Sequence, residues 1–234
     1  MKSYHGVLAA SVILLPLASA PSAADAQQRQ ARPLTGFNAI AIGGGIDLVL
    51  TKGDAFVVEV VASEDVAAKI VTEVVDNTLR ISRKTNFFRW GDGGTVYVTM
   101  PTLVSLDASG GSDVETEGTF ASNDLRIVAS GGSDLTIDVE AGTLAVEASG
   151  GSDMRLSGSA RSARVESSGG SDLNASALTA DEADVDSSGG SDLSIGVVRQ
   201  KISGDASGGS DVTYSGTPGS VTVNTSGGAK LHHR

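Results

Sequence analysis

The sequence predicts an all-β protein, a parallel β-solenoid with coils of about 20 residues. The motif Ser-Gly-Gly-Ser-Asp begins at residues 109, 130, 149, 168, 188 and 207, and a weaker copy, "SGGAK", begins at 226. Apolar and polar residues alternate before each motif and after each Asp, as in "LTIDV" from Leu135, which is typical of strands with one buried face. An antiparallel sandwich would not require the same turn chemistry every twenty residues, whereas a coil that stacks on its own copy does.

The first 26 residues have the layout of a secretory signal peptide. Lys2 precedes the apolar run "VLAASVILLPLA", and Ala24-Asp25-Ala26 fits the small residues of a cleavage site. We therefore expect residues 1–26 to be removed and the chain to be exported, to the periplasm, the cell surface or the medium of a Gram-negative bacterium. The run is too short to span a bilayer, so no transmembrane segment is expected in the mature chain.

The mature chain divides into four parts. Residues 27–35 are expected to be a linker and residues 36–229 one solenoid domain, with degenerate N-terminal coils over 36–101 and the repeats over 102–229. Within 36–101, "FVVEVVA", "TLRISR" and "TVYVTMP" indicate strands, and "SEDVAAKIVTEV" is either a short helix or a surface excursion. Residues 230–234 are expected to be a polar C-terminal tail. The whole domain would hold nine or ten coils.

Each motif is first of all a sharp corner. The residue before it is always small, and the two glycines permit a positive φ without steric penalty. Ser and Asp beside them are suited to bond nearby backbone N–H groups.

Several motifs, in order, resemble one family. The chain opens with "FNAIAIGGGIDLVLTKG", passes through "VYVTMPTLVSLDASGGSDV" and closes near "YSGTPGSVTVNTSGGA". It resembles the putative auto-transporter adhesin, head GIN domain family, over about residues 36–229. The resemblance implies a right-handed parallel β-helix on an exported bacterial protein, and it implies no catalytic residues.

The first candidate site is a column of six aspartates, one from each motif: Asp113, Asp134, Asp153, Asp172, Asp192 and Asp211. In neighbouring coils these carboxylates would lie about 4.8 Å apart and repel each other by about 1 kcal/mol per pair even in water. Either hydrogen bonds of the turn with solvent screening, or a row of Ca²⁺ ions, would offset this repulsion. Turn structure is the favoured interpretation and Ca²⁺ binding the alternative; no other cofactor is expected.

The second candidate site is an aromatic segment formed by Phe87, Phe88, Arg89 and Trp90. Such rings stack on sugars, which makes the segment a candidate glycan-binding site. The rival interpretation is that the rings cover an open end or side of the solenoid.

Charge and composition exclude several functions. The net charge of −11 argues against nucleic acid and anionic membranes as partners. Two adjacent histidines near the C-terminus make a poor metal site, and no nucleophile or phosphate-binding motif is present. We expect a structural or binding module of the cell envelope, adhesin-like and not an enzyme, whose partner is an envelope protein or a glycan. The alternatives are a β-helical carbohydrate-active lyase or hydrolase and a calcium-stabilised, self-associating surface protein; the sequence does not give the oligomeric state.

Overall fold

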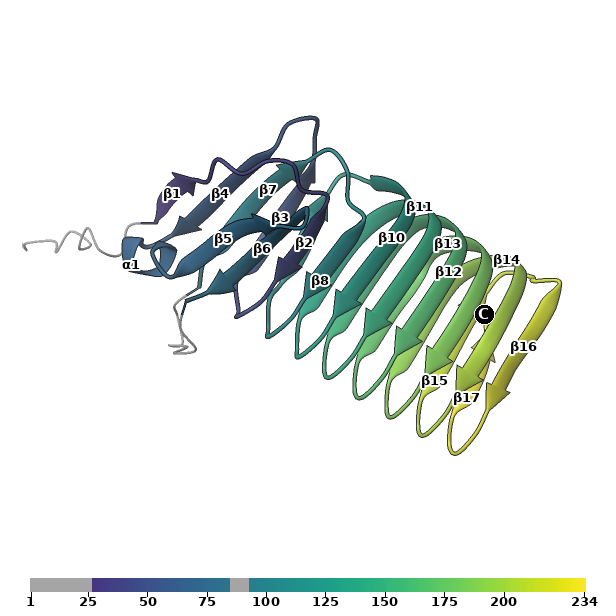
Figure 1. Cartoon of the computed structure of the whole chain (residues 1–234). Coiled ribbons are helices and arrows are strands. Elements are labelled where there is room, and N and C mark those ends of the chain that lie inside the picture. Colours follow the sequence, from purple (N-terminus) through teal and green to yellow (C-terminus); the bar gives the residue numbers. More distant parts are fainter. Residues whose placement is uncertain (1–26, 85–92) are drawn as a thin grey trace, which may run out of the picture.

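The computed structural model describes residues 27–84 and 93–234, and it is a parallel β-solenoid, as the repeat predicts. Figure 1 shows the coils stacked side by side toward the C-terminal end, with the N-terminal strands gathered at the other end. The solenoid has about seven turns, with coils of about 19 residues. The expectation of nine or ten coils is therefore too high, because part of the N-terminal region does not coil.

The repeat region supplies the regular coils. Its strands are β8 (Ser105–Ala108), β9 (Val114–Glu117), β10 (Phe120–Ala129), β11 (Asp134–Ala148), β12 (Asp153–Ser167), β13 (Asp172–Ser187), β14 (Asp192–Ala206), β15 (Asp211–Ser215), β16 (Ser220–Thr225) and β17 (Lys230–His233). Neighbouring coils pair in parallel and in register, so that Leu135 lies beside Met154 and Val146 beside Val165. The two strands expected in each repeat run together in β11 to β14, because the chain bends without a break opposite the glycine corner.

The N-terminal region has a different topology. Its elements are β1 (Gln28–Ala31), β2 (Ala39–Ile42), β3 (Asp47–Lys52), β4 (Val57–Ala62), α1 (Glu64–Ala67), β5 (Ile70–Val75), β6 (Thr78–Arg83) and β7 (Thr95–Met100). Strands β2 and β3 pair in parallel with β8 and β9 on one side and with β6 and β7 on the other. The chain therefore forms the second layer of the stack first, with β2 and β3, and the outer layer afterwards, with β6 and β7.

Three strands of this region are antiparallel to their neighbours. β4 pairs with β7, β1 with β4, and β5 with β6. Asp76 and Asn77, both with positive φ, form the tight turn of the β5–β6 hairpin. The stretch "SEDVAAKIVTEV", left open between helix and excursion, forms the one-turn helix α1 followed by β5.

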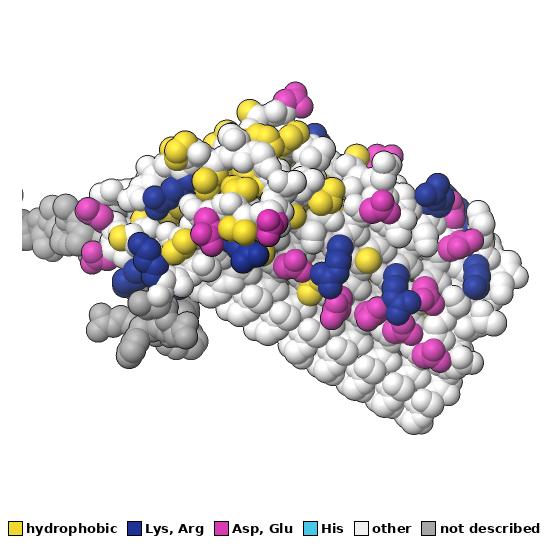
Figure 2. Space-filling model, in the orientation of Figure 1, with side chains coloured by type: hydrophobic (Ala, Val, Ile, Leu, Met, Phe, Trp, Pro, Cys, Tyr) yellow, Lys and Arg dark blue, Asp and Glu magenta, His cyan; other side chains and the backbone are white. Residues whose placement is uncertain are grey.

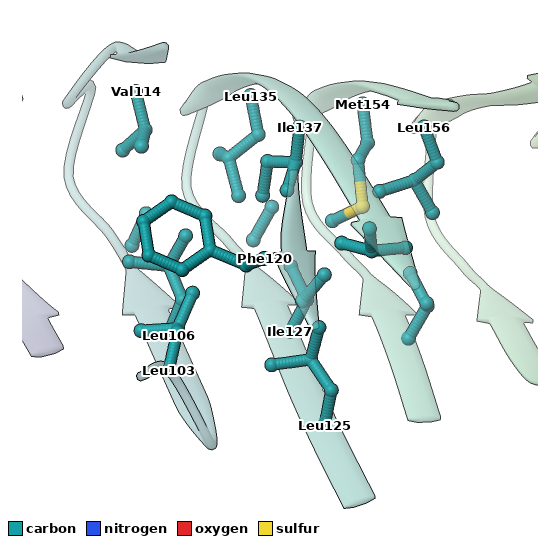
Figure 3. Close-up of a cluster of buried hydrophobic side chains, with 14 of the residues drawn as sticks. Leu103, Leu106, Val114, Phe120, Leu125, Ile127, Leu135, Ile137, Met154 and Leu156 are labelled. Atoms are coloured by element: carbon teal, nitrogen blue, oxygen red, sulfur yellow. The ribbon is translucent and has the colours of Figure 1, made fainter. Parts of the chain in front are cut away.

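The apolar side chains form one continuous core inside the coils. Figure 3 shows the Phe120 ring in the interior between Leu106 and Val114, with Leu135 and Ile137 beside it and Met154 and Leu156 farther along the stack. Farther along the repeat several inward positions are held by small residues, among them Ala163, Ala175 and Ala183. Small residues suit a narrow interior, because facing strands leave no room for large side chains in every layer.

Every corner contains a buried serine. The second Ser of each motif is completely buried (Ser112, Ser133, Ser152, Ser171, Ser191 and Ser210). From Ser133 onward its hydroxyl donates to the carbonyl three residues earlier, and from Ser152 onward also to a carbonyl of the preceding coil, as Ser171 does to Ser168 at 2.8 Å and to Ala148 at 3.1 Å. The expected bonds from backbone N–H groups occur at the first two of these serines, where Ile46 donates to Ser112 and Ser112 donates to Ser133. The hydroxyls thus tie each corner to the coil before it.

The segments at either end contain regular structure. Residues 27–35, expected as a linker, include β1, and residues 230–234, expected as a tail, include β17, which pairs with β15. In the part of the chain that the structure describes, no helix is long and apolar enough to cross a membrane.

Candidate binding face

The aspartates of the motifs form one column along the face built by the strands that follow the glycine corners. Asp134, Asp153, Asp172, Asp192 and Asp211 are direct partners from coil to coil. Asp113 and Asp47 precede the paired residues Val114 and Leu48, and they extend the column toward the N-terminal strands. Asp47 was missed in the sequence analysis, although its motif "GGGIDL" repeats the Gly-Gly-x-Asp spacing of the others.

Cationic or neutral residues stand at the two ends of this column. Lys230 is the in-register partner of Asp211, and its ammonium lies 3.8 Å from the Asp211 carboxylate. At the other end Asp47 pairs with Thr95 of β7. The column therefore holds seven carboxylates in a row, and we call the surface that carries it the Asp face.

The glycine corner sets the direction of these carboxylates. In the corner before Asp192, Gly189 has φ +79°, and a Cβ added there would lie 2.7 Å from the Gly169 carbonyl oxygen of the preceding coil. Only glycine allows this positive φ together with the close approach of the next corner. The first glycine of every corner has a positive φ, whereas the second has one only at Gly45, Gly111 and Gly132. Because the strands that follow pair in register, every Asp leaves the sheet on the same side, and the side chains form a ladder.

Neighbouring carboxylates perturb one another within the ladder. Burial first, and then the charge of Asp47, raise the pKa of Asp113 above its ordinary value of 3.8, while the backbone N–H of Asp134 acts in the opposite direction. The pKa of Asp134 is likewise raised, by burial first and then by the charges of Asp113 and Asp153. The backbone N–H of Asp153 and the cation of Arg155 lower it in part. The N–H of the next Asp in the column thus lowers the pKa at both positions, but it does not fully compensate burial and repulsion.

Two shallow grooves lie along the Asp face. One, of about 460 Å³, combines Asp47, Asp113, Asp134 and Glu115 with the ring of Tyr97. The other, of about 260 Å³, lies beside Asp153, Asp172 and Asp192 and includes Arg155 and Asn174. Their linings offer hydrogen-bond acceptors, and the first adds an aromatic surface, a combination suited to hydroxyl-rich or cationic ligands.

The geometry for a metal ion is less favourable. Among the residues that the structure describes, no group of three or more His, Cys, Asp or Glu side chains is gathered as a metal ion would need. Calcium takes six to eight oxygen ligands, which a single row of carboxylates with one member per coil does not supply by itself. The Asp column as a Ca²⁺ site stays a hypothesis.

The opposite face carries charges of both signs. Arg164 bonds Glu166, Asp184 and Asp186 at 2.7–2.9 Å, and Arg126 bonds Asp107 and Glu147 at 3.0 and 3.1 Å. Figure 2 shows alternating basic and acidic side chains over the repeat strands, whereas hydrophobic side chains gather over the N-terminal elements. Burial and the nearby carboxylates raise the pKa of Asp186 despite the opposing charge of Arg164.

The aromatic candidate site lies outside the described residues. Phe87, Phe88, Arg89 and Trp90 all fall within 85–92, and the predicted signal peptide falls within 1–26. The expectations for both segments remain predictions.

Comparison with known proteins identifies the family. The model of the putative auto-transporter adhesin, head GIN domain family matches residues 36–218. The chain belongs to this family. The repeat corners and the Asp face up to Asp211 thus fall within the head GIN domain.

Solved structures share the fold of this head GIN domain. A putative adhesin from Bacteroides fragilis is 22% identical, with a TM-score of 0.84 over 89% of this chain and 97% of its own. A putative lipid binding protein from Parabacteroides distasonis is 15% identical, with a TM-score of 0.70 over 89% of this chain and 96% of its own. A putative adhesin from Parabacteroides merdae is 16% identical, with a TM-score of 0.67 over 89% of this chain and 96% of its own. No curated protein matches the chain.

Proposed function

We propose that the protein is an exported, adhesin-like structural and binding module of the bacterial cell envelope, without catalytic activity. The observation that carries the proposal is the Asp face, a flat surface on which seven carboxylates stand in register along shallow grooves. The family and the similar structures described as putative adhesins support a binding role. The partner is an envelope glycan or protein that presents hydroxyl or cationic groups to this face.

The groove beside Tyr97 is the part of the Asp face best suited to hold a ligand. Its carboxylates accept hydrogen bonds from hydroxyls or ammonium groups, and the Tyr97 ring supplies an apolar surface for a sugar ring. The Arg29 guanidinium lies 5.1 Å from the ring centroid, so one side of the ring already contacts a cation of the chain and the other is left for a ligand. Stacking together with hydrogen bonding would give orientation as well as affinity.

Binding to envelope material tests this proposal. The full chain is labelled and its binding to isolated envelope glycans and proteins is compared with that of Tyr97→Ala and Asp113→Asn. We expect both variants to bind at least about tenfold more weakly, since interface aromatic and charged groups dominate binding energy. The matched controls, Ser203→Ala and Asp205→Asn on the opposite face, should bind normally. Equal binding by all variants would reject the Asp face as the binding surface.

The location in the cell is tested separately. We expect the full chain, expressed in a Gram-negative host, to be recovered outside the cytoplasm with Gln27 as its first residue. A cytoplasmic product that keeps Met1 would contradict export.

The carbohydrate-active enzyme is the second candidate function, because several carboxylates and an arginine meet on the opposite face. Arg164 with Glu166, Asp184 and Asp186 combines carboxylates with a cation, and the pKa of Asp186 is raised, as in a general acid. However, these side chains are 36–52% exposed on an open sheet, where water is not excluded. We therefore interpret this cluster as an ion-pair network and not as an active site. Polysaccharide cleavage by the protein that disappears in Asp186→Asn would contradict this interpretation.

A further inference from the structure

The last coil of the solenoid exposes side chains that every earlier coil buries. Val221 of β16 is 42% exposed, whereas its in-register partner Ile202 is completely buried. Leu231 of β17 is partly buried, whereas its partner Val212 is completely buried. At the N-terminal end the corresponding interior is closed by α1 and β4, whose Ala62 and Ala67 are fully buried. The two ends of the solenoid are therefore not equivalent.

The same coil presents unpaired strand edges. β16 pairs with β14 and β17 with β15, and in residues 27–84 and 93–234 no further strand pairs with either. The N–H groups of Lys230 and Arg234 donate to carbonyls of the preceding coil, at Ser210 and Tyr214. Successive residues of a strand direct their backbone groups to opposite sides, so those of Leu231 and His233 point to the open edge. Such an edge is a template for one more strand.

The charge of this edge differs from that of the rest of the chain. The chain carries a net charge of −11, yet the segment after Asp211 contains no Asp or Glu and includes Lys230 and Arg234. Lys230 takes the position that aspartate holds in the six motifs before it. If one more strand were added, a carboxylate at the next position of this column would therefore lie beside the Lys230 ammonium group and not beside another carboxylate.

A second copy of the chain is a poor occupant of this edge. If two copies met through the same end, the Lys230 and Arg234 of one copy would approach those of the other, and like charges on neighbouring strands oppose pairing. Stacking of this end on the N-terminal end of another copy would place the open last coil against α1 and β4, which already close the interior there. Charge complementarity thus points to an acidic partner.

We propose that β16 and β17 form a docking edge for an acidic, extended segment of a partner protein, which adds to β17 as the next strand. Its backbone would pair with Leu231 and His233, its carboxylates would face Lys230 and Arg234, and its apolar side chains would cover Leu231 and Val221. This mode is β-strand addition, in which the backbone supplies affinity and alternate side chains supply specificity. The docking edge is the strand edge at the C-terminal end of the Asp column and does not include the grooves of the Asp face, so it goes beyond the proposed function and does not rest on it.

The test uses a labelled synthetic peptide of eight residues in which Asp and Val alternate, titrated with the full chain and followed by fluorescence anisotropy. We expect saturable binding that weakens as the salt concentration rises, because charge pairs at an exposed edge are screened. Lys230→Glu and Val221→Glu should each weaken binding about tenfold or more. A peptide in which Lys and Val alternate should not bind.

The chain offers a matched control for each variant. Lys201→Glu reverses an exposed charge one coil inside the end, and Val57→Glu changes a valine that, like Val221, is 42% exposed but lies on β4. Both should bind the acidic peptide within about twofold of the unchanged protein. If Val221→Glu unfolds the last coil by circular dichroism, Lys230→Glu and Arg234→Glu decide the outcome, since their side chains are exposed.

Three outcomes would overturn the proposal. The first is the absence of saturable binding, and the second is equal loss of binding in the control variants. The third is a dimer in sedimentation experiments that Lys230→Glu converts to a monomer, which would assign the edge to a second copy of the chain.

Discussion

The N-terminal region and the repeat region bury apolar side chains in two different ways. In the N-terminal region the core contains large side chains such as Leu48, Leu50 and Ile81, and antiparallel strands with α1 close the end. In the repeat region large buried side chains such as Phe120 are mixed with small ones such as Ala175, and the corners repeat in register and are tied together by buried serines. The first region therefore depends mostly on packed volume, whereas the second depends in addition on the identity of its corners.

The largest expected effect comes from a cavity in the N-terminal core. Leu48→Ala should lower the free energy of unfolding in urea by about 2–5 kcal/mol, because Leu48 is 1% exposed and lies between β7 and β9. Leu231 occupies the same column in the last coil but is only partly buried, so Leu231→Ala should cost less than about 1 kcal/mol. Equal losses in the two variants would show that the ends are packed alike.

A smaller effect is expected at a repeat corner. Gly189→Ala should lower the free energy of unfolding by about 1–2 kcal/mol or more, because φ is +79° there and the new Cβ would lie 2.7 Å from the Gly169 carbonyl oxygen. Gly190→Ala is the adjacent control, because its Cβ would have no neighbour closer than 3.9 Å and its φ is not positive. The measurement is urea unfolding of both variants, and an equal cost would contradict the role assigned to the first glycine.

A still smaller effect concerns pH. The folded-state pKa values of Asp113 and Asp134 lie above the ordinary value of 3.8, so the folded protein binds these protons more tightly than the unfolded chain does. Their ionised carboxylates make an unfavourable contribution to the free energy of folding, which is full at neutral pH. This contribution falls as the pH drops through the raised folded pKa values, and it is absent below 3.8. Asp134→Asn should therefore stabilise the protein at neutral pH and reduce the gain on acidification, as measured by thermal melts across this range. A variant with the same pH profile as the unchanged protein would show that the ladder carries no strain.

The smallest effect is expected from calcium. We expect the melting temperature to be the same in excess Ca²⁺ and in excess chelator, because the column offers only one carboxylate per coil, fewer oxygen ligands than calcium takes. A clear rise in Ca²⁺ that disappears in Asp153→Asn would favour the calcium-stabilised alternative. Asp205→Asn, on the opposite face, is the control.

The sequence by itself determined the repeat region almost completely. The spacing of the motifs and the alternation of apolar residues determine the coil length, the register and six members of the Asp column, because each motif places a positive-φ glycine at the same point of its coil. The same pattern gave the family, since the motifs occur in a fixed order.

Only the tertiary structure decided how the N-terminal strands are arranged. Strands β4 and β6 both alternate between buried and more exposed residues, yet β4 pairs antiparallel with β7 and β6 pairs in parallel with β2. Alternation alone does not reveal whether a strand pairs in parallel or antiparallel. The insertion of β2 and β3 between β6–β7 and β8–β9 depends on contacts between residues far apart in the chain, and so does the place of Asp47 in the column. The open, cationic edge at β16 and β17 also emerged only in three dimensions, because exposure depends on which strands have a neighbour and not on the residues of the strand itself.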